Sequence, residues 1–70
     1  MRVFIIAVEK SDGYMTSFRT NFWVGTDIDA ARAALAEAQG RASGRFDSVD
    51  IEEWLDGQDV TNSDRTLKFC

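Results

Sequence analysis

The sequence predicts a small α+β domain in which one helix packs on one face of an antiparallel sheet of four strands. The prediction rests on a short apolar run at residues 3–8 and on a stretch at residues 30–38 that is rich in alanine. Alternating polar and apolar residues elsewhere are typical of strands. The predicted element order is β-β-α-β-β, and a short fifth strand at residues 58–61 remains open.

The first two strands are predicted to form a hairpin. Residues 3–8 are continuously apolar, which is typical of a central strand with both faces covered. The Asp12-Gly13 pair then predicts a tight turn. From Tyr14 to Val24 the residues alternate between two faces. One face carries Tyr14, Thr16, Phe18, Thr20, Phe22 and Val24, and the other carries Ser17, Arg19 and Asn21.

A helix is predicted from Thr26, as the N-cap, to about Gln39. Asp29 lies three positions after Thr26 and completes a capping box. Gly40 is expected to provide a left-handed C-cap. At helical spacing, one apolar stripe faces the sheet. It consists of Ile28, Ala31, Leu35 and Ala38.

The last third of the chain predicts two more strands. Phe46 to Leu55 alternates, with Val49, Ile51 and Leu55 on one face and Ser48, Asp50, Glu52 and Trp54 on the other. Turns are expected at Asp56-Gly57 and at residues 62–64. Leu67 and Phe69 then predict a final strand.

A helical crossover that returns the chain past the first strand predicts the strand order 2-1-3-4, with every neighbouring pair antiparallel. One helix covers one side of this sheet, so half of the apolar residues of the first strand need another cover. They are either Phe4, Ile6 and Val8 or the alternate set Val3, Ile5 and Ala7. Sheet curvature, a second protomer or a partner could cover them.

The composition argues against an enzyme. The chain has 70 residues, enough for a single domain over residues 1–70, with no His and one Cys, Cys70. The usual catalytic base and the commonest zinc ligand are therefore missing, and we expect neither a cofactor nor a metal. The acids at residues 56–64 do not follow the spacing of an EF-hand. The apolar run at residues 3–8 is too short for a signal peptide or a membrane span, which predicts a cytoplasmic protein.

The net charge of -4 argues against direct binding to nucleic acid. The negative charge also disfavours a platform on which the bases of single-stranded nucleic acid would stack. Such a platform would use Tyr14, Phe18, Phe22 and Arg19. The charge is also uneven. Residues 1–45 carry five acids and six bases, whereas residues 46–70 carry seven acids and two bases.

These acids are the candidate binding residues for a basic protein surface. Asp50 and Glu52 are expected on one face of a strand, about 6.8 Å apart. Trp54 lies among the acids, in the manner of an interface anchor, whereas Trp23 is expected to pack. The candidate site consists of Asp47, Asp50, Glu52, Glu53, Trp54, Asp56 and Asp59. The competing interpretation is an acidic face that serves only solubility.

In form, the chain resembles the small phage-encoded anti-CRISPR proteins. The resemblance lies in its length and acidity, the strand start at residues 1–8, one alanine-rich helix between hairpins and the acidic stretch at residues 47–64. It implies a DNA mimic in the host cytoplasm that blocks a basic DNA-binding surface of a CRISPR surveillance complex. The alternative is a structural module, monomeric or weakly dimeric, that self-associates through its uncovered sheet face or an edge strand.

Overall fold

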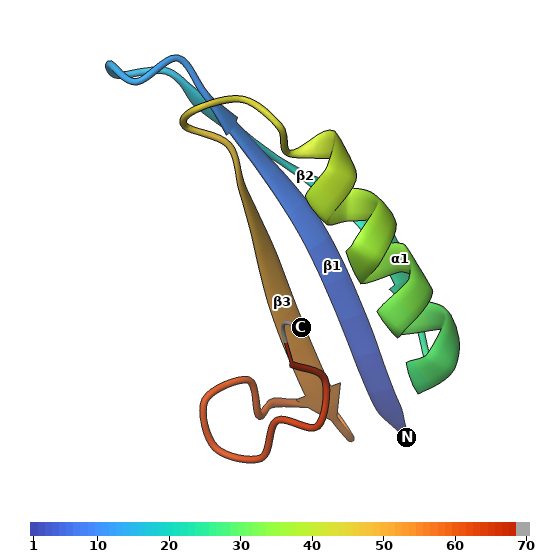
Figure 1. The fold of residues 1–70 in the computed structure, drawn as a ribbon. Helices are drawn as coiled ribbons and strands as arrows, with labels where there is room; N and C mark the ends of the chain where they lie inside the picture. Colours follow the sequence, from blue (N-terminus) through green and yellow to red (C-terminus); the bar gives the residue numbers. More distant parts are fainter. Residues whose placement is uncertain (69–70) are drawn as a thin grey trace.

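The computed structural model describes residues 1–68, which form one sheet and one helix (Figure 1). The elements are β1 (Arg2–Ser11), β2 (Ser17–Gly25), α1 (Ile28–Arg41), β3 (Ser48–Leu55) and β4 (Gln58–Asp59). The sheet order is β2-β1-β3-β4, and each neighbouring pair is antiparallel. The predicted α+β class, the four-stranded antiparallel sheet and the central order β2-β1-β3 are confirmed, whereas the fourth strand is a different segment from the predicted one.

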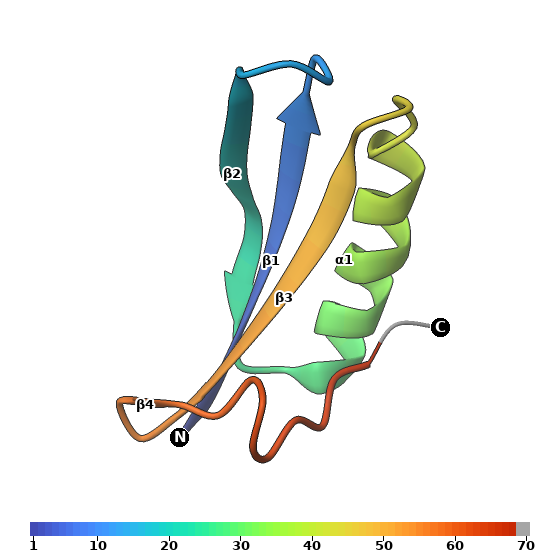
Figure 2. The same ribbon diagram turned by 90° about the vertical axis from the view of Figure 1, so that its left-hand side faces the viewer.

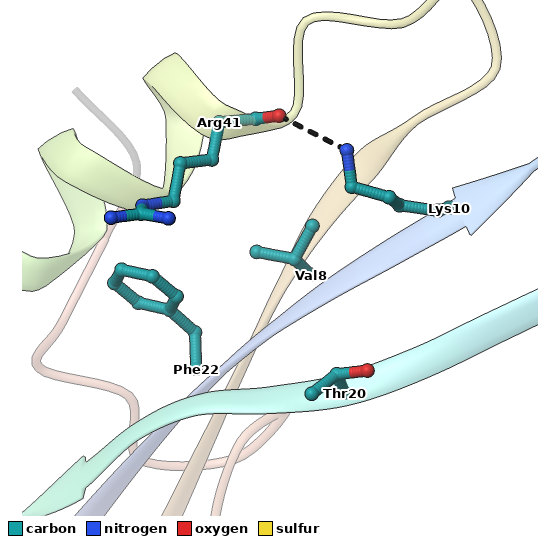
Figure 3. A pocket seen from close by; sticks show the side chains of 5 residues that line it. All are labelled: Val8, Lys10, Thr20, Phe22 and Arg41. Carbon is teal, nitrogen blue, oxygen red and sulfur yellow. Dashed lines mark hydrogen bonds between the residues drawn. The ribbon is translucent and has the colours of Figure 1, made fainter.

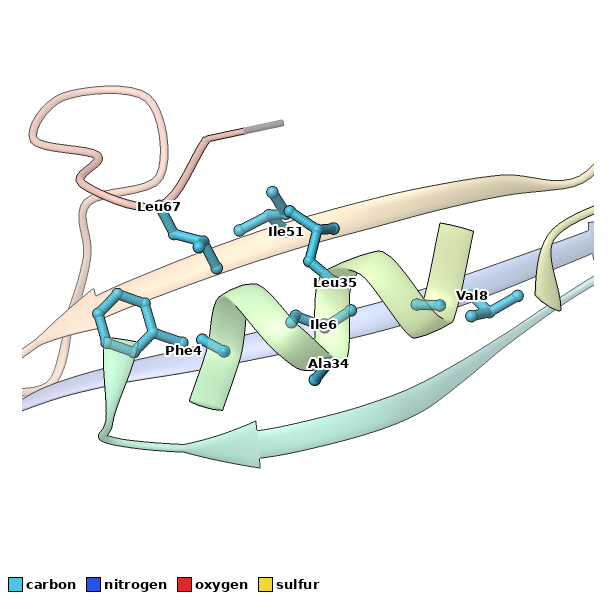
Figure 4. Packing of buried hydrophobic residues seen from close by; sticks show 9 residues of the cluster. Phe4, Ile6, Val8, Ala34, Leu35, Ile51 and Leu67 are labelled. Carbon is cyan, nitrogen blue, oxygen red and sulfur yellow. The ribbon is translucent and has the colours of Figure 1, made fainter. Parts of the chain in front are cut away.

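The hydrophobic core lies between α1 and the adjacent face of the sheet (Figure 4). From β1, Phe4, Ile6 and Val8 point into it, so this set of alternate residues is the one that the helix covers. The alanines on α1 let the helix approach the sheet closely, and Leu35 is its one large buried side chain. The buried helix residues are Ala31, Ala34, Leu35 and Ala38, which confirms most of the predicted stripe.

A β-bulge in β2 changes which side chains face the core. Ile6 pairs with Trp23 and Ala7 with Asn21, so Phe22 is an extra residue in the ladder. Because an extra residue inverts the alternation, Phe22 and Trp23 both pack against the core. The predicted packing of Trp23 is confirmed. The predicted placement of Val24 beside Phe22 is wrong, since Val24 points away from the helix and is 55% exposed.

The ends of α1 differ from the predicted ones. Asp27, not Thr26, is the N-cap, because its carboxylate accepts a hydrogen bond of 3.0 Å from the amide of Asp29. At the other end Gly40 lies within the helix, and the chain leaves it at Ala42. The Arg41 guanidinium lies over the ring of Phe22, 5.3 Å from its centroid, which helps to extend the last turn beyond the glycine.

The C-terminal part of the sheet is also shorter than predicted. β4 pairs with the end of β3, so the fourth strand is the short segment that the sequence left open. The Asp56-Gly57 turn between them has positive φ at both residues, as a tight hairpin turn requires. Beyond β4 the chain leaves the sheet and runs back beside the end of β3, near the end of α1 where the helix begins (Figures 1 and 2). The strand predicted at Leu67 is wrong, because residues 60–68 belong to no strand, although Leu67 does pack in the core. Phe69 lies outside the described residues.

Candidate functional site

The side of the sheet that faces away from α1 gathers several of the predicted binding residues. We call this side the open face. Its residues follow from the register of the three long strands. They are Val3, Ile5, Ala7 and Glu9 of β1, Arg19, Asn21 and Val24 of β2, and Asp50, Glu52 and Trp54 of β3.

An apolar strip crosses the open face. Val3 pairs with Trp54 on one side of β1, and Ile5 pairs with Val24 on the other. Val3, Ile5 and Trp54 are half-buried, and Val24 is more exposed. The indole Nε1 of Trp54 donates to Oε1 of Glu52 at 3.2 Å, which satisfies its polar atom and restrains the ring. The strip therefore presents a restrained aromatic side chain beside aliphatic ones.

Arg19 connects the two outer strands of this face. Its guanidinium forms an ion pair with Glu52 and lies 3.9 Å from a carboxylate oxygen of Asp50. To do so the side chain crosses β1 beside Ala7, which is fully buried. Arg19 thus covers the middle of the face and neutralises part of its charge. With Glu9, Asp50 and Glu52 against one arginine, the face keeps a net negative charge.

Asp59 extends this negative charge at the edge of the sheet. It lies in β4 directly beside Trp54 in the ladder and is exposed. Hydrogen bonds from the hydroxyl and the amide of Thr61 hold the pKa of Asp59 below its usual range. Asp50, Glu52, Trp54 and Asp59 are therefore the predicted site residues that the fold brings together.

Two other predicted acids lie elsewhere. Asp47 lies near the far end of β1, where the amide of Gly44 and then the ammonium of Lys10 lower its pKa. Asp56, in the turn between β3 and β4, pairs with the amino group of Met1. The acidic stretch of the sequence is therefore divided among several places in the fold.

The prediction that Glu53 binds a partner is wrong, because its side chain is fully buried on the helix side of the sheet. Burial by itself raises the pKa of Glu53, but the amides of Leu67 and Thr66, together with Arg2, outweigh it and lower the pKa. A signal was present in the sequence, because Glu53 continues the alternation of Val49 and Ile51 toward the core.

A hollow of about 390 Å³ lies beside the end of α1 and was not predicted (Figure 3). Val8 and Phe22 line it together with Lys10, Thr20 and Arg41. The ammonium of Lys10 donates to the carbonyl of Arg41 at 3.3 Å. Lys10 also pairs with Asp47, and Arg41 pairs with Glu37, so the cations of this hollow are balanced within the chain.

Within residues 1–68, no group of three or more His, Cys, Asp or Glu side chains is arranged to hold a metal ion. Over the same residues, no helix has the length and apolar character needed to cross a membrane. Comparison with known proteins found no matching family model, no matching curated protein and no matching solved structure.

Proposed function

We propose that this chain is a non-enzymatic protein-binding inhibitor that docks its open face against a basic surface of a nucleic-acid-binding protein complex. The observation that carries the proposal is the position of Trp54, in an apolar strip bordered by Asp50, Glu52 and Asp59. The small phage-encoded anti-CRISPR proteins, which the chain resembles in form, suggest a CRISPR surveillance complex as the target.

The chemistry of this face fits a protein partner. Stable interfaces combine an apolar centre, often with a tryptophan, and a polar rim. Here Trp54, Val3 and Ile5 supply the centre, and each is already partly ordered by its place in the sheet. Binding to such a restrained surface loses little side-chain entropy.

The carboxylates contribute in a different way. Glu52 and Asp50 share Arg19, so a partner's arginine or lysine can add to an existing ion pair without breaking it. Duplex DNA carries about one negative charge per 1.7 Å of its axis, and this density of charge is far higher than that of the open face. The block is therefore mainly steric, and the charges accelerate encounter more than they raise affinity.

The test measures binding of a target DNA duplex to a purified CRISPR surveillance complex in the presence of the chain. We expect the chain to displace DNA, and Trp54→Ala and Asp50→Lys each to weaken this effect at least tenfold. Glu37→Lys is the matched control, because it makes the same charge change on the exposed side of α1. Equal inhibition by all variants would exclude the open face.

Self-association through the same face is the second candidate. Two observations favour self-association. Val24 is exposed on this face, and the outer edge of β2, which contains Val24, pairs with no strand within residues 1–68. Light scattering across a salt series separates the two proposals. Apolar self-association changes little with ionic strength, whereas docking on a basic partner weakens as salt is added.

A further inference from the structure

The outer edge of β2 is available for pairing with another strand. β2 is the outermost strand of the sheet, and its residues 17–21 are exposed and pair regularly with β1 on their inner side (Figure 2). Within residues 1–68, no turn or loop hydrogen-bonds to the main chain of residues 17–21. Their outward main-chain groups therefore form a template to which a further strand can add.

The features that usually protect an edge strand are weak here. β2 contains no proline, and its one charged residue is Arg19. The guanidinium of Arg19 is directed across the open face to Glu52 and Asp50, away from the outer edge. The β-bulge at Phe22 twists the strand beyond residue 21. Residues 17–21 are thus a regular edge without the charge or proline that blocks strand addition.

β2 also forms one wall of the hollow beside the end of α1 (Figure 3). Thr20 and Phe22 of β2 line the hollow opposite Arg41 of the helix. Thr20 pairs with Val8, whose side chain packs in the core beneath α1, so Thr20 also faces the helix side. A long side chain that stands opposite Thr20 on an added strand needs to pass over only this small residue to enter the hollow.

The cations of this hollow favour an acidic side chain. Lys10 donates to the carbonyl of Arg41 and to Asp47, each at 3.3 Å, which leaves one proton of its ammonium for a further acceptor. Arg41 uses one N–H group in its pair with Glu37 at 3.2 Å, and both side chains of this pair are exposed. Exposed pairs are weak, so a carboxylate in the hollow can accept from Lys10 and Arg41 with little loss.

Phe18 sets the character of the neighbouring position. It pairs with Lys10 and lies on the helix side, where its ring is 69% exposed. A second hollow, of about 340 Å³, lies beside this ring and is lined by Asp12 and Asp47. These two carboxylates disfavour an acid of the partner at this place. An apolar side chain opposite Phe18 would instead cover the exposed ring.

We propose that the outer edge of β2 binds an extended peptide of a partner protein by antiparallel strand addition, with an Asp or Glu opposite Thr20 and a large apolar residue two positions later, opposite Phe18. Main-chain hydrogen bonds to residues 17–21 provide affinity, and the two side chains provide specificity. Antiparallel addition continues the pairing of the whole sheet. Both side chains lie on the helix side, so the inference does not depend on the proposed function of the open face.

The first experiment titrates the isotope-labelled full-length chain with the end-blocked peptide Thr-Thr-Glu-Val-Phe-Thr, called the parent peptide. NMR should show saturable shifts in the amides of residues 17–21, Lys10 and Arg41, together with nuclear Overhauser effects between the peptide and β2. Replacing Glu by Lys or Phe by Ser in the peptide should each weaken binding at least tenfold. Equal binding of the three peptides would overturn the proposed side-chain positions.

Strand addition itself is tested by two N-methylated forms of the parent peptide. Alternate amides of an antiparallel strand point toward its neighbour, and the others point away from it. Methyl groups on the first set should weaken binding at least tenfold, whereas methyl groups on the second set should leave it unchanged. Equal binding of the two forms, or an equal loss, would overturn strand addition.

The role of the hollow is tested in the chain by Arg41→Glu. This variant should bind the parent peptide at least tenfold more weakly and should bind the peptide with Lys in place of Glu more tightly. Arg32→Glu is the matched control, because it makes the same charge change on α1 at a residue that pairs with Asp29 in the first turn. If Arg41→Glu bound both peptides as wild type does, the hollow would have no part in recognition.

Sedimentation of the chain without peptide tests whether a second copy occupies the same edge. We expect a monomer at the concentrations used for the titration. A dimer in which the amides of residues 17–21 are protected from hydrogen exchange, and which excess parent peptide does not dissociate, would overturn the proposal in favour of pairing between two copies of β2.

Discussion

Glu53 is the residue on which the C-terminal half of the fold depends most. Removing a carboxylate from water is unfavourable unless hydrogen bonds and a cation replace the lost hydration. Thr66 and Leu67 supply the hydrogen bonds, and Arg2 supplies the cation. The same carboxylate also raises the pKa of Arg2 further, after the larger effect of Asp64. A single side chain thus joins the start of β1 to the end of the chain.

Replacing Glu53 by Gln tests this dependence. The folded-state pKa of Glu53 is lowered, so its charge stabilises the fold above the unfolded-state pKa, about 4.5, and this stabilisation is lost as pH falls through the lower folded value. We expect Glu53→Gln to lower the free energy of unfolding by about 2–3 kcal/mol at pH 7. Urea denaturation between pH 7 and pH 2 should show this difference shrinking in acid.

Glu52→Gln is the control for that series, because Glu52 lies next in sequence but on the open face. Its ion pair with Arg19 is partly exposed to solvent, so the free energy of unfolding should change by less than about 1 kcal/mol. A difference between Glu53→Gln and wild type that stays constant at every pH would contradict the role given to the charge.

At the scale of the element, α1 contains a residue that weakens it. Gly40 lies inside the helix, where its flexible unfolded state costs stability relative to alanine. A Cβ at this position would meet no atom within 4 Å, so alanine fits without strain. The helix continues past Gly40 because Arg41 is held by Phe22 and by Glu37.

Gly40→Ala should therefore raise the free energy of unfolding by about 0.5–1 kcal/mol. The matched control is Gly57→Ala. Gly57 has φ of +86° in the turn between β3 and β4, so alanine should destabilise there by at least a similar amount. Thermal and urea unfolding followed by circular dichroism measure both effects. A loss of stability in Gly40→Ala would show that the helix ends before this residue in solution.

The helix and strands also show which elements a sequence pattern can predict and which it cannot. Alternation and alanine content were sufficient for β1, α1 and β3, because each depends on a local period, and the crossover rule then placed β3 beside β1. The bulge at Phe22 could not be predicted, since either residue of the Phe22-Trp23 pair could have faced the core. The final strand failed for another reason: Leu67 does alternate with Phe69, but the amide of Leu67 is taken up by Glu53 instead of a neighbouring strand.

For the whole molecule, the uneven charge of the sequence is largely evened out in space. Bases from the first forty-five residues pair with acids from the last twenty-five. Arg2 pairs with Glu53, Lys10 with Asp47 and Arg19 with Glu52. β1 lies between β2 and β3, and its antiparallel pairing with both brings these residues together. This is why four of the seven predicted site residues share one face while the others are used elsewhere.

The molecule is elongated, with extents of 37 × 22 × 17 Å, and α1 does not reach the turn between β1 and β2 (Figures 1 and 2). The fold should therefore open from this end. We expect amides of residues 12–16 to exchange with solvent fastest and those of residues 4–8 in the central strand slowest. Hydrogen exchange followed by NMR measures this gradient. Equal protection at both places would contradict it.

The turn between β1 and β2 is also a suitable place to attach a probe. Tyr14 and Met15 at its tip are 91% and 98% exposed, and they belong neither to the open face nor to the lining of the hollow beside α1. A photoreactive amino acid or a fluorophore introduced at Met15 should therefore report on a captured neighbour without altering either surface. Because this hairpin projects from the molecule, crosslinking from its tip in living cells should identify the protein that this chain binds.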